Sequence, residues 1–170
     1  IQLLDPRQVS RAVDLLRRSR RVVCMGQGSS MVLSEEAWTL FSTVSPKFLF
    51  VPDSHLQMNT LALMDPDELV LFFSYSGSTR DFQDLLEVAR QRQVKVVLVS
   101  RFPKSPGGQL ADVVLQCGSK EGPLQVGSVA ARVAQLYLTD VLFHEVCRRD
   151  AARCAATREI VAEVLSDKHI

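Results

Sequence analysis

Residues 69–82 read Leu-Val-Leu-Phe-Phe-Ser-Tyr-Ser-Gly-Ser-Thr-Arg-Asp-Phe, and this stretch decides the fold. Its first five residues are all apolar, a run too short for a helix and typical of a strand buried on both faces of a parallel sheet. A polar turn, Ser74–Thr79, ends the strand. From Phe82 onward apolar residues return at helical spacing, with Ser78 or Thr79 placed to cap the helix. The stretch therefore predicts a strand, a hydroxyl-rich turn and a helix.

A turn of this kind can bind phosphate. The N-terminus of a helix presents unpaired N–H groups and the positive end of the helix dipole. Gly77 lets the backbone approach an anion closely, and the hydroxyls of Ser74, Ser76, Ser78 and Thr79 can donate hydrogen bonds. The alternative is that these residues merely make a good turn and cap, because short motifs often match by chance. The turn alone does not decide between the two interpretations.

A second unit of the same kind stands about fifty residues earlier in the chain. Val22–Met25 forms an apolar run, Gly26–Ser30 follows as a Gly/Ser turn, and Leu33, Ala37 and Phe41 then trace one face of a helix. The turn begins like a dinucleotide-binding fingerprint but lacks its third glycine, so it is weak evidence for a site when taken by itself.

Three further apolar runs, Phe48–Val51, Val94–Val99 and Ala111–Cys117, predict more strands between helices. Five short strands alternating with helices indicate an α/β fold, a doubly wound parallel sheet with helices on both faces. In the flavodoxin-like order 2-1-3-4-5, ligands bind where the strand order reverses, between strands one and three. Both Gly/Ser turns follow those strands. They predict one binding crevice, lined by Gly28, Ser29, Ser30, Ser74, Ser76, Ser78 and Thr79.

The remaining helices lie at the two ends of the chain. Asp5-Pro6 starts the first, and the basic run Arg17–Arg21 at its end is expected to complement the helix dipole rather than bind phosphate. The long helix from Ser128 to Arg149 is apolar on more than one side, which is typical of a helix buried on two sides and predicts a homodimer built partly on it. Asp150 starts a last helix, whose apolar residues are expected to face inward: Ile160, Val161, Val164 and Leu165.

Composition narrows the class of protein. A length of 170 residues with 46% hydrophobic residues suits one domain with a real core, and a net charge of +1 argues against a nucleic-acid footprint over the whole domain. No apolar run is long enough to span a membrane. The four cysteines include no C-x-x-C pair and no cluster with His at metal spacing, so we expect no metal and no other cofactor. Cys24 and Cys117 suit buried thiols in a reducing cytoplasm. The chain opens with Ile1 rather than Met, and we expect a segment upstream of it.

The turn Ser74–Thr79, preceded by Gly26–Ser30, is similar to that of the sugar-isomerase (SIS) domain, a family that binds phosphorylated sugars and holds the phosphate on an S-x-S-G-x-[ST] turn. A closer resemblance is to the effector domain of RpiR-type transcriptional regulators, and it covers nearly the whole chain. Four segments carry it: Leu4–Arg20, Pro52–Gln57, Leu110–Val114 and Ala134–Phe143.

The resemblance implies that residues 1–20 are a connector helix from an upstream DNA-binding domain and that residues 21–170 are a phosphosugar-binding SIS domain. It implies a cytoplasmic sensor, a homodimer or higher oligomer, that binds a phosphorylated sugar or sugar acid and contacts DNA only through the upstream helix-turn-helix domain. It adds Gly77, His55 and Ser128 to the ligand-binding residues named above.

The alternative is an enzyme, a phosphosugar aldose–ketose isomerase. Such a reaction needs a base and an acid, for which Glu121 and His55 are candidates. A solvated loop carboxylate and a hydroxyl-binding histidine are the simpler interpretations of the two residues. Arabinose-phosphate isomerases usually carry Lys where this chain has Ser29, and many SIS enzymes carry Glu where it has Ser78. These departures favour a sensor over an enzyme.

Overall fold

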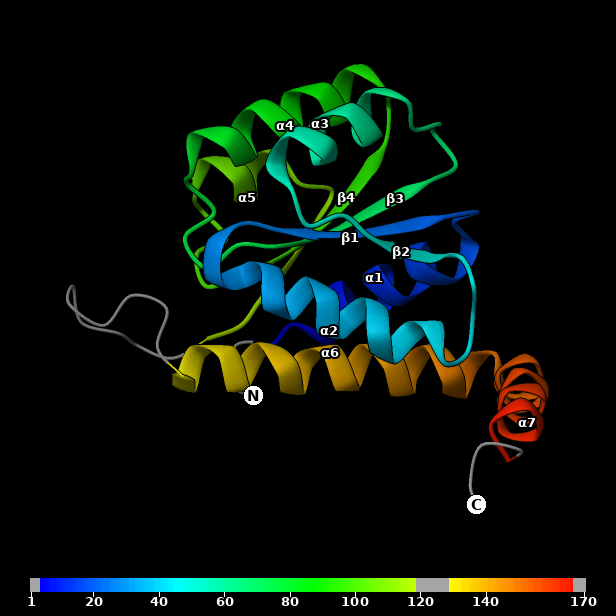
Figure 1. The fold of residues 1–170 in the computed structure, drawn as a ribbon. Helices are drawn as coiled ribbons and strands as arrows, with labels where there is room; N and C mark the ends of the chain where they lie inside the picture. Colours follow the sequence, from blue (N-terminus) through cyan, green and yellow to red (C-terminus); the bar gives the residue numbers. More distant parts are fainter. Residues whose placement is uncertain (1–3, 119–128, 167–170) are drawn as a thin grey trace.

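The computed structural model describes residues 4–118 and 129–166, and its centre is a five-stranded parallel sheet (Figure 1). The strand order is β2-β1-β3-β4-β5, which confirms the predicted fold and order. The strands are β1 (Val22–Gly26), β2 (Phe48–Phe50), β3 (Leu69–Phe73), β4 (Lys95–Ser100) and β5 (Val113–Gln116).

Helices cover both faces of the sheet. In Figure 1, α1, α2 and α6 lie on one face, and α3, α4 and α5 lie on the other. The helices are α1 (Pro6–Arg18), α2 (Met31–Ser42), α3 (Ser54–Ala62), α4 (Arg80–Gln91), α5 (Pro106–Leu110), α6 (Val129–Arg149) and α7 (Ala151–Ser166), with a short 3-10 turn, η1 (Gly28–Ser30), before α2.

The central strands are buried on both faces, as their unbroken apolar runs predict. Every residue of β1 and of β3 is buried. Alternate side chains of β1 enter different cores, with Val22 and Cys24 on the α1/α2/α6 side and Val23 and Met25 on the α3/α4 side. Burial raises the pKa of the Cys24 thiol to about 12, so this cysteine is an inert core residue.

Three helix starts, those of α1, α3 and α5, use the caps that the sequence indicates. Asp5 accepts a hydrogen bond from the Arg7 N–H at 2.8 Å, Asp53 from the Leu56 N–H at 2.9 Å, and Ser105 from the Gly108 N–H at 3.1 Å. The helices α2 and α4 start without such a bond. Ser30 and Thr79 occupy their N-cap positions, yet neither side chain makes a capping hydrogen bond.

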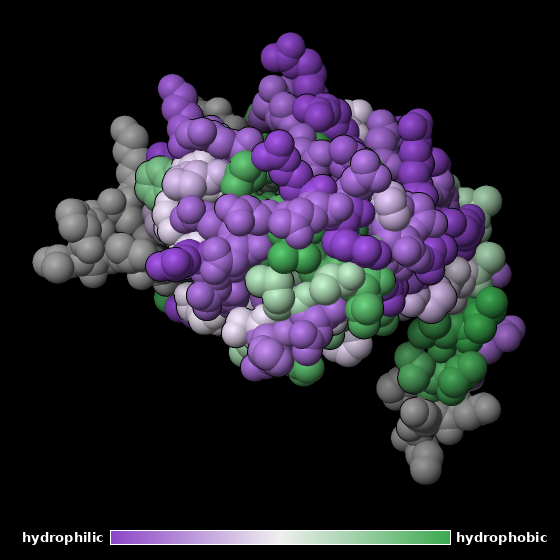
Figure 2. All heavy atoms as spheres, turned by 90° about the horizontal axis from the view of Figure 1, so that it is seen from above, coloured by the Kyte–Doolittle hydropathy of each residue, from purple (hydrophilic) through white to green (hydrophobic). Residues whose placement is uncertain are grey.

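The prediction that the apolar residues of α7 face inward is wrong for this chain. Within α7 Cys154 alone is buried, whereas Ile160, Val161, Val164 and Leu165 are 36–63% exposed. The reason is that α7 projects beyond the end of α6, past the sheet and its covering helices (Figure 1). Figure 2 shows hydrophobic residues gathered on this projecting helix. The apolar stripe is real, but it stays exposed among residues 4–118 and 129–166.

The basic run at the end of α1 is bound by carboxylates. Arg20 contacts Asp67 and Asp65, and Arg21 contacts Glu68 with its Nε 2.6 Å from Oε1. The side chain of Glu68 is fully buried and also accepts a hydrogen bond from the Asp65 N–H at 2.9 Å. These groups stand where β1 and β3 begin, at the amino edge of the sheet, and they fasten the end of α1 to the turn before β3.

We expect Glu68→Gln to destabilise the fold by about 2–3 kcal/mol, because it leaves Arg21 without the buried carboxylate that neutralises it. Asp67→Asn is the matched control, since Asp67 is exposed and such surface pairs contribute no more than about 0.5–1 kcal/mol. Urea denaturation of the two variants measures the difference. Equal small losses would show that the buried pair does not fasten the edge.

Candidate functional site

The two Gly/Ser turns leave the sheet side by side. In the β1–β3 register Gly26 is the partner of Phe73, the residue before Ser74. Both chains therefore emerge at the carboxyl edge of the sheet at neighbouring positions, as the strand order predicts. On the first turn Gly28 and Ser29 are exposed and Ser30 is half-buried. An added Cβ at Gly26 would stand 2.6 Å from the Ser30 carbonyl oxygen, so the tight path of this turn requires a glycine there.

Internal hydrogen bonds hold the turn Ser74–Thr79 in shape. The Ser74 Oγ accepts from the Gly77 N–H at 3.1 Å, and the Ser76 Oγ accepts from the Ser78 N–H at 3.2 Å. A hydroxyl that accepts from the backbone keeps its own proton to donate. The Ser78 hydroxyl differs, because it donates to the Ser76 carbonyl at 3.1 Å. Ser76 is thus arranged as a donor toward a ligand, and Ser78 is not.

Gly77 is required at its position for two reasons. Its φ of 62° lies in the left-handed region, and an added Cβ would overlap the Ser105 Oγ. Its carbonyl accepts a hydrogen bond from the Gly107 N–H at 2.9 Å. The start of α5 therefore packs against the turn after β3 and supports its shape.

The N-terminus of α4 follows the turn directly. This helix begins at Arg80 and is 12 residues long, so its first-turn N–H groups and positive dipole end adjoin the serine hydroxyls. Thr79 lies at the boundary with its hydroxyl not engaged in capping. Asp81 stands in the first turn of the helix and weakens this positive end. The arrangement suits an anion that binds at the turn itself.

A hollow of about 650 Å³ lies beside the turn. Residues that line it include Ser76, Ser78, Arg101, Lys104, Ser105 and Gln116. Two of them are cationic, and none of the described residues that line the hollow is a carboxylate. The Arg101 guanidinium carbon lies 5.7 Å from the centre of the Phe102 ring, a cation–π contact that helps position the charge.

Sequence reasoning missed the contribution of the β4–α5 loop to this hollow. Arg101 and Lys104 directly follow β4 and therefore stand at the same carboxyl edge as the Gly/Ser turns. The rule that places ligands at this edge would have selected them. Neither residue belongs to a Gly/Ser turn, so the motif search did not include them.

Gln57 was also missed as a supporting residue. Its side chain is fully buried, and Nε2 donates to the Gly26 carbonyl at 2.9 Å and to the Val51 carbonyl at 2.8 Å. It thereby ties the start of α3 to the ends of β1 and β2. His55, two residues earlier, is exposed in the first turn of α3 and is not among the residues that line the hollow.

Two sequence-predicted residues, Glu121 and Ser128, lie outside the described residues. In the part of the chain that the structure describes, no group of three or more His, Cys, Asp and Glu side chains could hold a metal ion. No helix within residues 4–118 and 129–166 combines the length and apolar character needed to cross a membrane.

The two turns and the sheet that carries them match a known protein family. The family model of the SIS domain matches residues 15–145, which include both turns and all five strands. This chain belongs to the SIS-domain family. The HTH-type transcriptional regulator RpiR of Escherichia coli K12 is 26% identical to the SIS chain over 141 residues, which are 83% of this chain and 48% of that protein. The chain spans 48–60% of the length of the curated relatives it matches.

Solved structures share the same SIS fold. NanR of Vibrio vulnificus, complexed with ManNAc-6P, has a TM-score of 0.89 and 25% identity, covering 98% of this chain and 62% of that one. The sugar isomerase domain of an RpiR transcription factor from Sphaerobacter thermophilus has a TM-score of 0.84 and 21% identity, covering 95% and 89% of the two chains. The second likeness supports the fold alone.

We expect Gly77→Ala to cost about 3 kcal/mol or more of stability, because it combines a left-handed backbone with an overlap on Ser105. Gly28→Ala is the matched control. Its φ is 56°, but an added Cβ there meets nothing within 4 Å, so the cost should be about 1 kcal/mol. Denaturant titration separates the two, and equal losses would mean that packing against α5 does not constrain the turn.

Proposed function

We propose that this SIS domain is the phosphosugar-binding effector domain of a transcriptional regulator of sugar metabolism. One observation carries the proposal. The turn Ser74–Thr79 is held so that the Ser76 hydroxyl keeps its proton free to donate, next to the N-terminus of α4. The HTH-type regulators among its relatives, and the ManNAc-6P complex of the similar NanR, support the choice of a regulator over other phosphate-binding proteins.

The phosphate is proposed to bind at the turn. A phosphate dianion accepts several hydrogen bonds at once, and Ser76, Thr79 and the first-turn N–H groups of α4 supply donors close together. Ser74 is buried beneath the turn, and its hydroxyl holds the Gly77 N–H, so it orients the turn. Arg101 and Lys104 add positive charge along the adjoining hollow.

The sugar is proposed to extend toward the first turn. Ser29 and Ser30 carry hydroxyls suited to the neutral hydroxyls of a sugar, and Gly28 leaves room for a close approach. His55 at the start of α3 and Ser128 are further proposed contacts. Neutral hydroxyls need only single partners, so this side of the site requires no concentrated charge.

A regulatory role assigns the rest of the chain as follows. Residues 1–20 connect the SIS domain, residues 21–170, to a DNA-binding domain upstream, and the whole acts in the cytoplasm as a homodimer or higher oligomer. Catalysis is not part of the proposal. Ser29 and Ser78 stand where isomerases of the family usually carry Lys and Glu, and an aldose–ketose assay with the bound sugar phosphate tests this.

The proposed phosphate site predicts a distinctive pattern of affinities. Ser76→Ala and Thr79→Ala should each weaken a phosphosugar by about tenfold or more, because a hydrogen bond to a charged group contributes about 1.5–3 kcal/mol. The affinity for inorganic phosphate should fall by a similar factor in both variants. Ser30→Ala should weaken the phosphosugar and leave inorganic phosphate nearly unchanged. Isothermal titration calorimetry with a panel of sugar 6-phosphates and with phosphate measures all three variants.

Ser78→Ala is the internal control for that series. Its hydroxyl proton is engaged by the Ser76 carbonyl, so we expect a smaller loss than for Ser76→Ala. If the turn variants bind as tightly as the parent protein, the phosphate does not bind at this turn and the proposed function fails with it.

The paired arginines predict weak binding to DNA. Because Arg17, Arg20 and Arg21 already contact carboxylates, residues 1–170 should bind duplex DNA weakly and without sequence preference. Electrophoretic mobility shifts at physiological salt, with operator and scrambled duplexes, check this. Tight, sequence-selective binding would place DNA recognition within this chain and contradict the assigned division of labour.

A further inference from the structure

A cationic loop, residues 101–105, lies on the side of the turn Ser74–Thr79 that is away from the first Gly/Ser turn. In the strand order β2-β1-β3-β4-β5, the turn after β3 stands between the first turn, which follows β1, and the cationic loop, which follows β4. Neighbouring strands are about 4.8 Å apart, so the cationic loop lies one strand spacing beyond the turn. The site therefore has three parts in a row, with the proposed phosphate position in the middle.

Hydrogen bonds fasten the cationic loop to the turn Ser74–Thr79. The Arg101 N–H and the Ser100 Oγ both donate to the Tyr75 carbonyl, each at 3.1 Å. The Gln116 Nε2 donates to the Arg101 carbonyl at 3.3 Å. The rings of Tyr75 and Phe102 meet edge to face with their centres 5.8 Å apart. The loop and the turn therefore form one unit, so the cations keep a fixed place beside the proposed phosphate position.

The hollow beside this unit brings two cationic side chains together. A Cβ added at Gly118 would stand 3.2 Å from the Arg101 Cδ, so the stem of Arg101 packs just beyond the end of β5. Lys104 is exposed and lines the same hollow. Arg101 thus offers a planar fork of donors held by packing, and Lys104 adds a point charge on a flexible stem.

The hollow has room for more than a contact to one phosphate. Its volume of about 650 Å³ falls within the range of roughly 300–1,000 Å³ that small-molecule sites occupy. Pro103 and the ring of Phe102, which is 49% exposed, also line it. A ligand confined to the two Gly/Ser turns would leave this volume unused.

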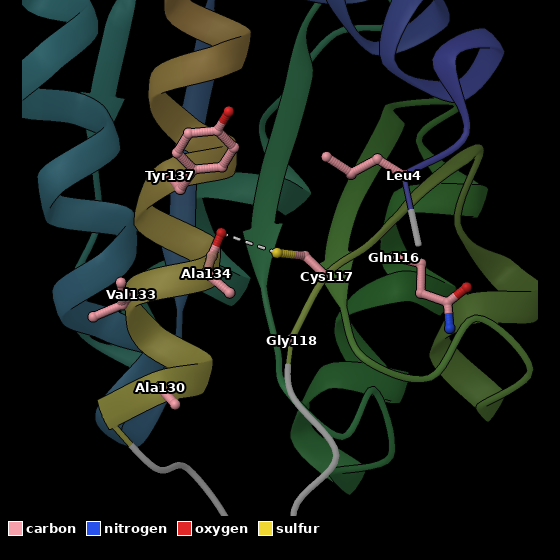
Figure 3. A pocket seen from close by; sticks show the side chains of 8 residues that line it. All are labelled: Leu4, Gln116, Cys117, Gly118, Ala130, Val133, Ala134 and Tyr137. Carbon is pink, nitrogen blue, oxygen red and sulfur yellow. Dashed lines mark hydrogen bonds between the residues drawn. The ribbon is translucent and has the colours of Figure 1, made fainter. Parts of the chain in front are cut away.

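The neighbouring cavity on the α6 side has a different character. It measures about 480 Å³, and the side chains that line it are mainly apolar and include Leu4, Ala130, Val133 and Ala134 (Figure 3). Figure 3 shows Cys117 pointing toward α6, where its Sγ donates to the Ala134 carbonyl at 3.0 Å, and Gln116 pointing away from α6. An anion would lose its hydration in that cavity without meeting a cation among the described lining residues. The hollow with Arg101 and Lys104 is the better place for a charged group.

A second anionic group in the hollow has to be joined to the phosphate rather than to the sugar. The proposed function places the sugar on the other side of the turn, toward Gly26–Ser30, which contains no cation. A carboxylate or phosphoryl group carried by the sugar would therefore lie away from Arg101 and Lys104. A phosphoryl group that shares a bridging oxygen with the first one would lie beside it, next to the cationic loop.

We propose that the ligand is a sugar esterified to a diphosphate, with its first phosphoryl group on the turn Ser74–Thr79 and its second on Arg101 and Lys104. This inference rests on the proposed function and narrows its class of ligand. The Arg101 guanidinium can pair with two oxygens of one phosphoryl group. The space beside Phe102 then accepts whatever the second phosphoryl group carries. A nucleoside diphosphate sugar and a simple sugar diphosphate share this chemistry.

Inorganic phosphate and inorganic diphosphate probe the second position by isothermal titration calorimetry. We expect the parent chain to bind diphosphate at least about tenfold more tightly than phosphate, because the second phosphoryl group gains charge-assisted hydrogen bonds. Arg101→Gln and Lys104→Gln should each remove most of this preference. Both should lower the affinity for phosphate by a clearly smaller factor, because an anion on the turn alone does not reach the two side chains.

Arg90→Gln is the matched control, since diphosphate also carries more charge than phosphate. Arg90 is exposed in the last turn of α4, at the opposite edge of the sheet, and its loss changes the net charge by the same single unit. This variant should keep the preference for diphosphate. Far-UV circular dichroism checks that all variants remain folded.

Uridine diphosphate glucose and glucose 1-phosphate extend the test to sugars. The diphosphate ester should bind more tightly than the monophosphate, and Lys104→Gln should reduce the difference. Phe102→Ala then separates the two sources of a diphosphate. A loss confined to uridine diphosphate glucose indicates a nucleoside beside the ring, and no loss indicates a simple sugar diphosphate.

Two results would overturn the diphosphate proposal. One is a parent chain that binds phosphate and diphosphate equally tightly. The other is a pair of variants, Arg101→Gln and Lys104→Gln, that lose no more affinity for diphosphate than Arg90→Gln does. Ser76→Ala keeps this failure apart from a failure of the proposed function. If Ser76→Ala still weakens phosphate, the phosphate position stands and only the second position is wrong.

Discussion

The pairing of β1 with β3 is the constraint on which the candidate site depends. Because Gly26 and Phe73 are partners in the register, two turns separated by about fifty residues of sequence leave the sheet next to each other. Helices cover both faces of a parallel sheet, so the polar turns lie at the two edges where the strands begin and end. Gln57 then fixes the ends of β1 and β2 through two carbonyls, and Gly107 of α5 fixes Gly77. Hydrogen bonds to backbone groups therefore hold the site from both sides.

The sequence was sufficient for the parts of this structure that depend on local pattern. Unbroken apolar runs identify β1 and β3, and Asp53 and Ser105 identify helix starts, because each signal acts within a few residues. The strand order could be inferred as well, since two Gly/Ser turns belong where a doubly wound sheet reverses.

What the sequence could not supply depends on contacts between distant segments. The approach of Ser105 to Gly77 joins residues 28 positions apart, and no periodicity encodes it. Arg101 and Lys104 belong to no recognised motif, and only their position along the hollow in the folded chain indicates a role for them. The apolar stripe on α7 is a second feature that the sequence alone could not place. Periodicity identifies an apolar face, but it does not say whether the cover comes from the same chain or from another.

The two edges of the sheet use positive charge in different ways. At the amino edge Arg17, Arg20 and Arg21 face Asp150, Asp67 and Glu68, and the pairs fasten α1 to the sheet and to the start of α7. At the carboxyl edge Arg101 and Lys104 line a hollow together with serine hydroxyls and the amide of Gln116, and none of the described residues that line it is a carboxylate. A net charge of +1 for the whole chain conceals this separation. Cations paired with carboxylates at the amino edge serve as structural joints, and the positive charges of Arg101 and Lys104 lie beside the serine hydroxyls of the candidate site. Composition predicts no nucleic-acid footprint over the whole domain, while the site that suits phosphate depends on which edge each cation occupies.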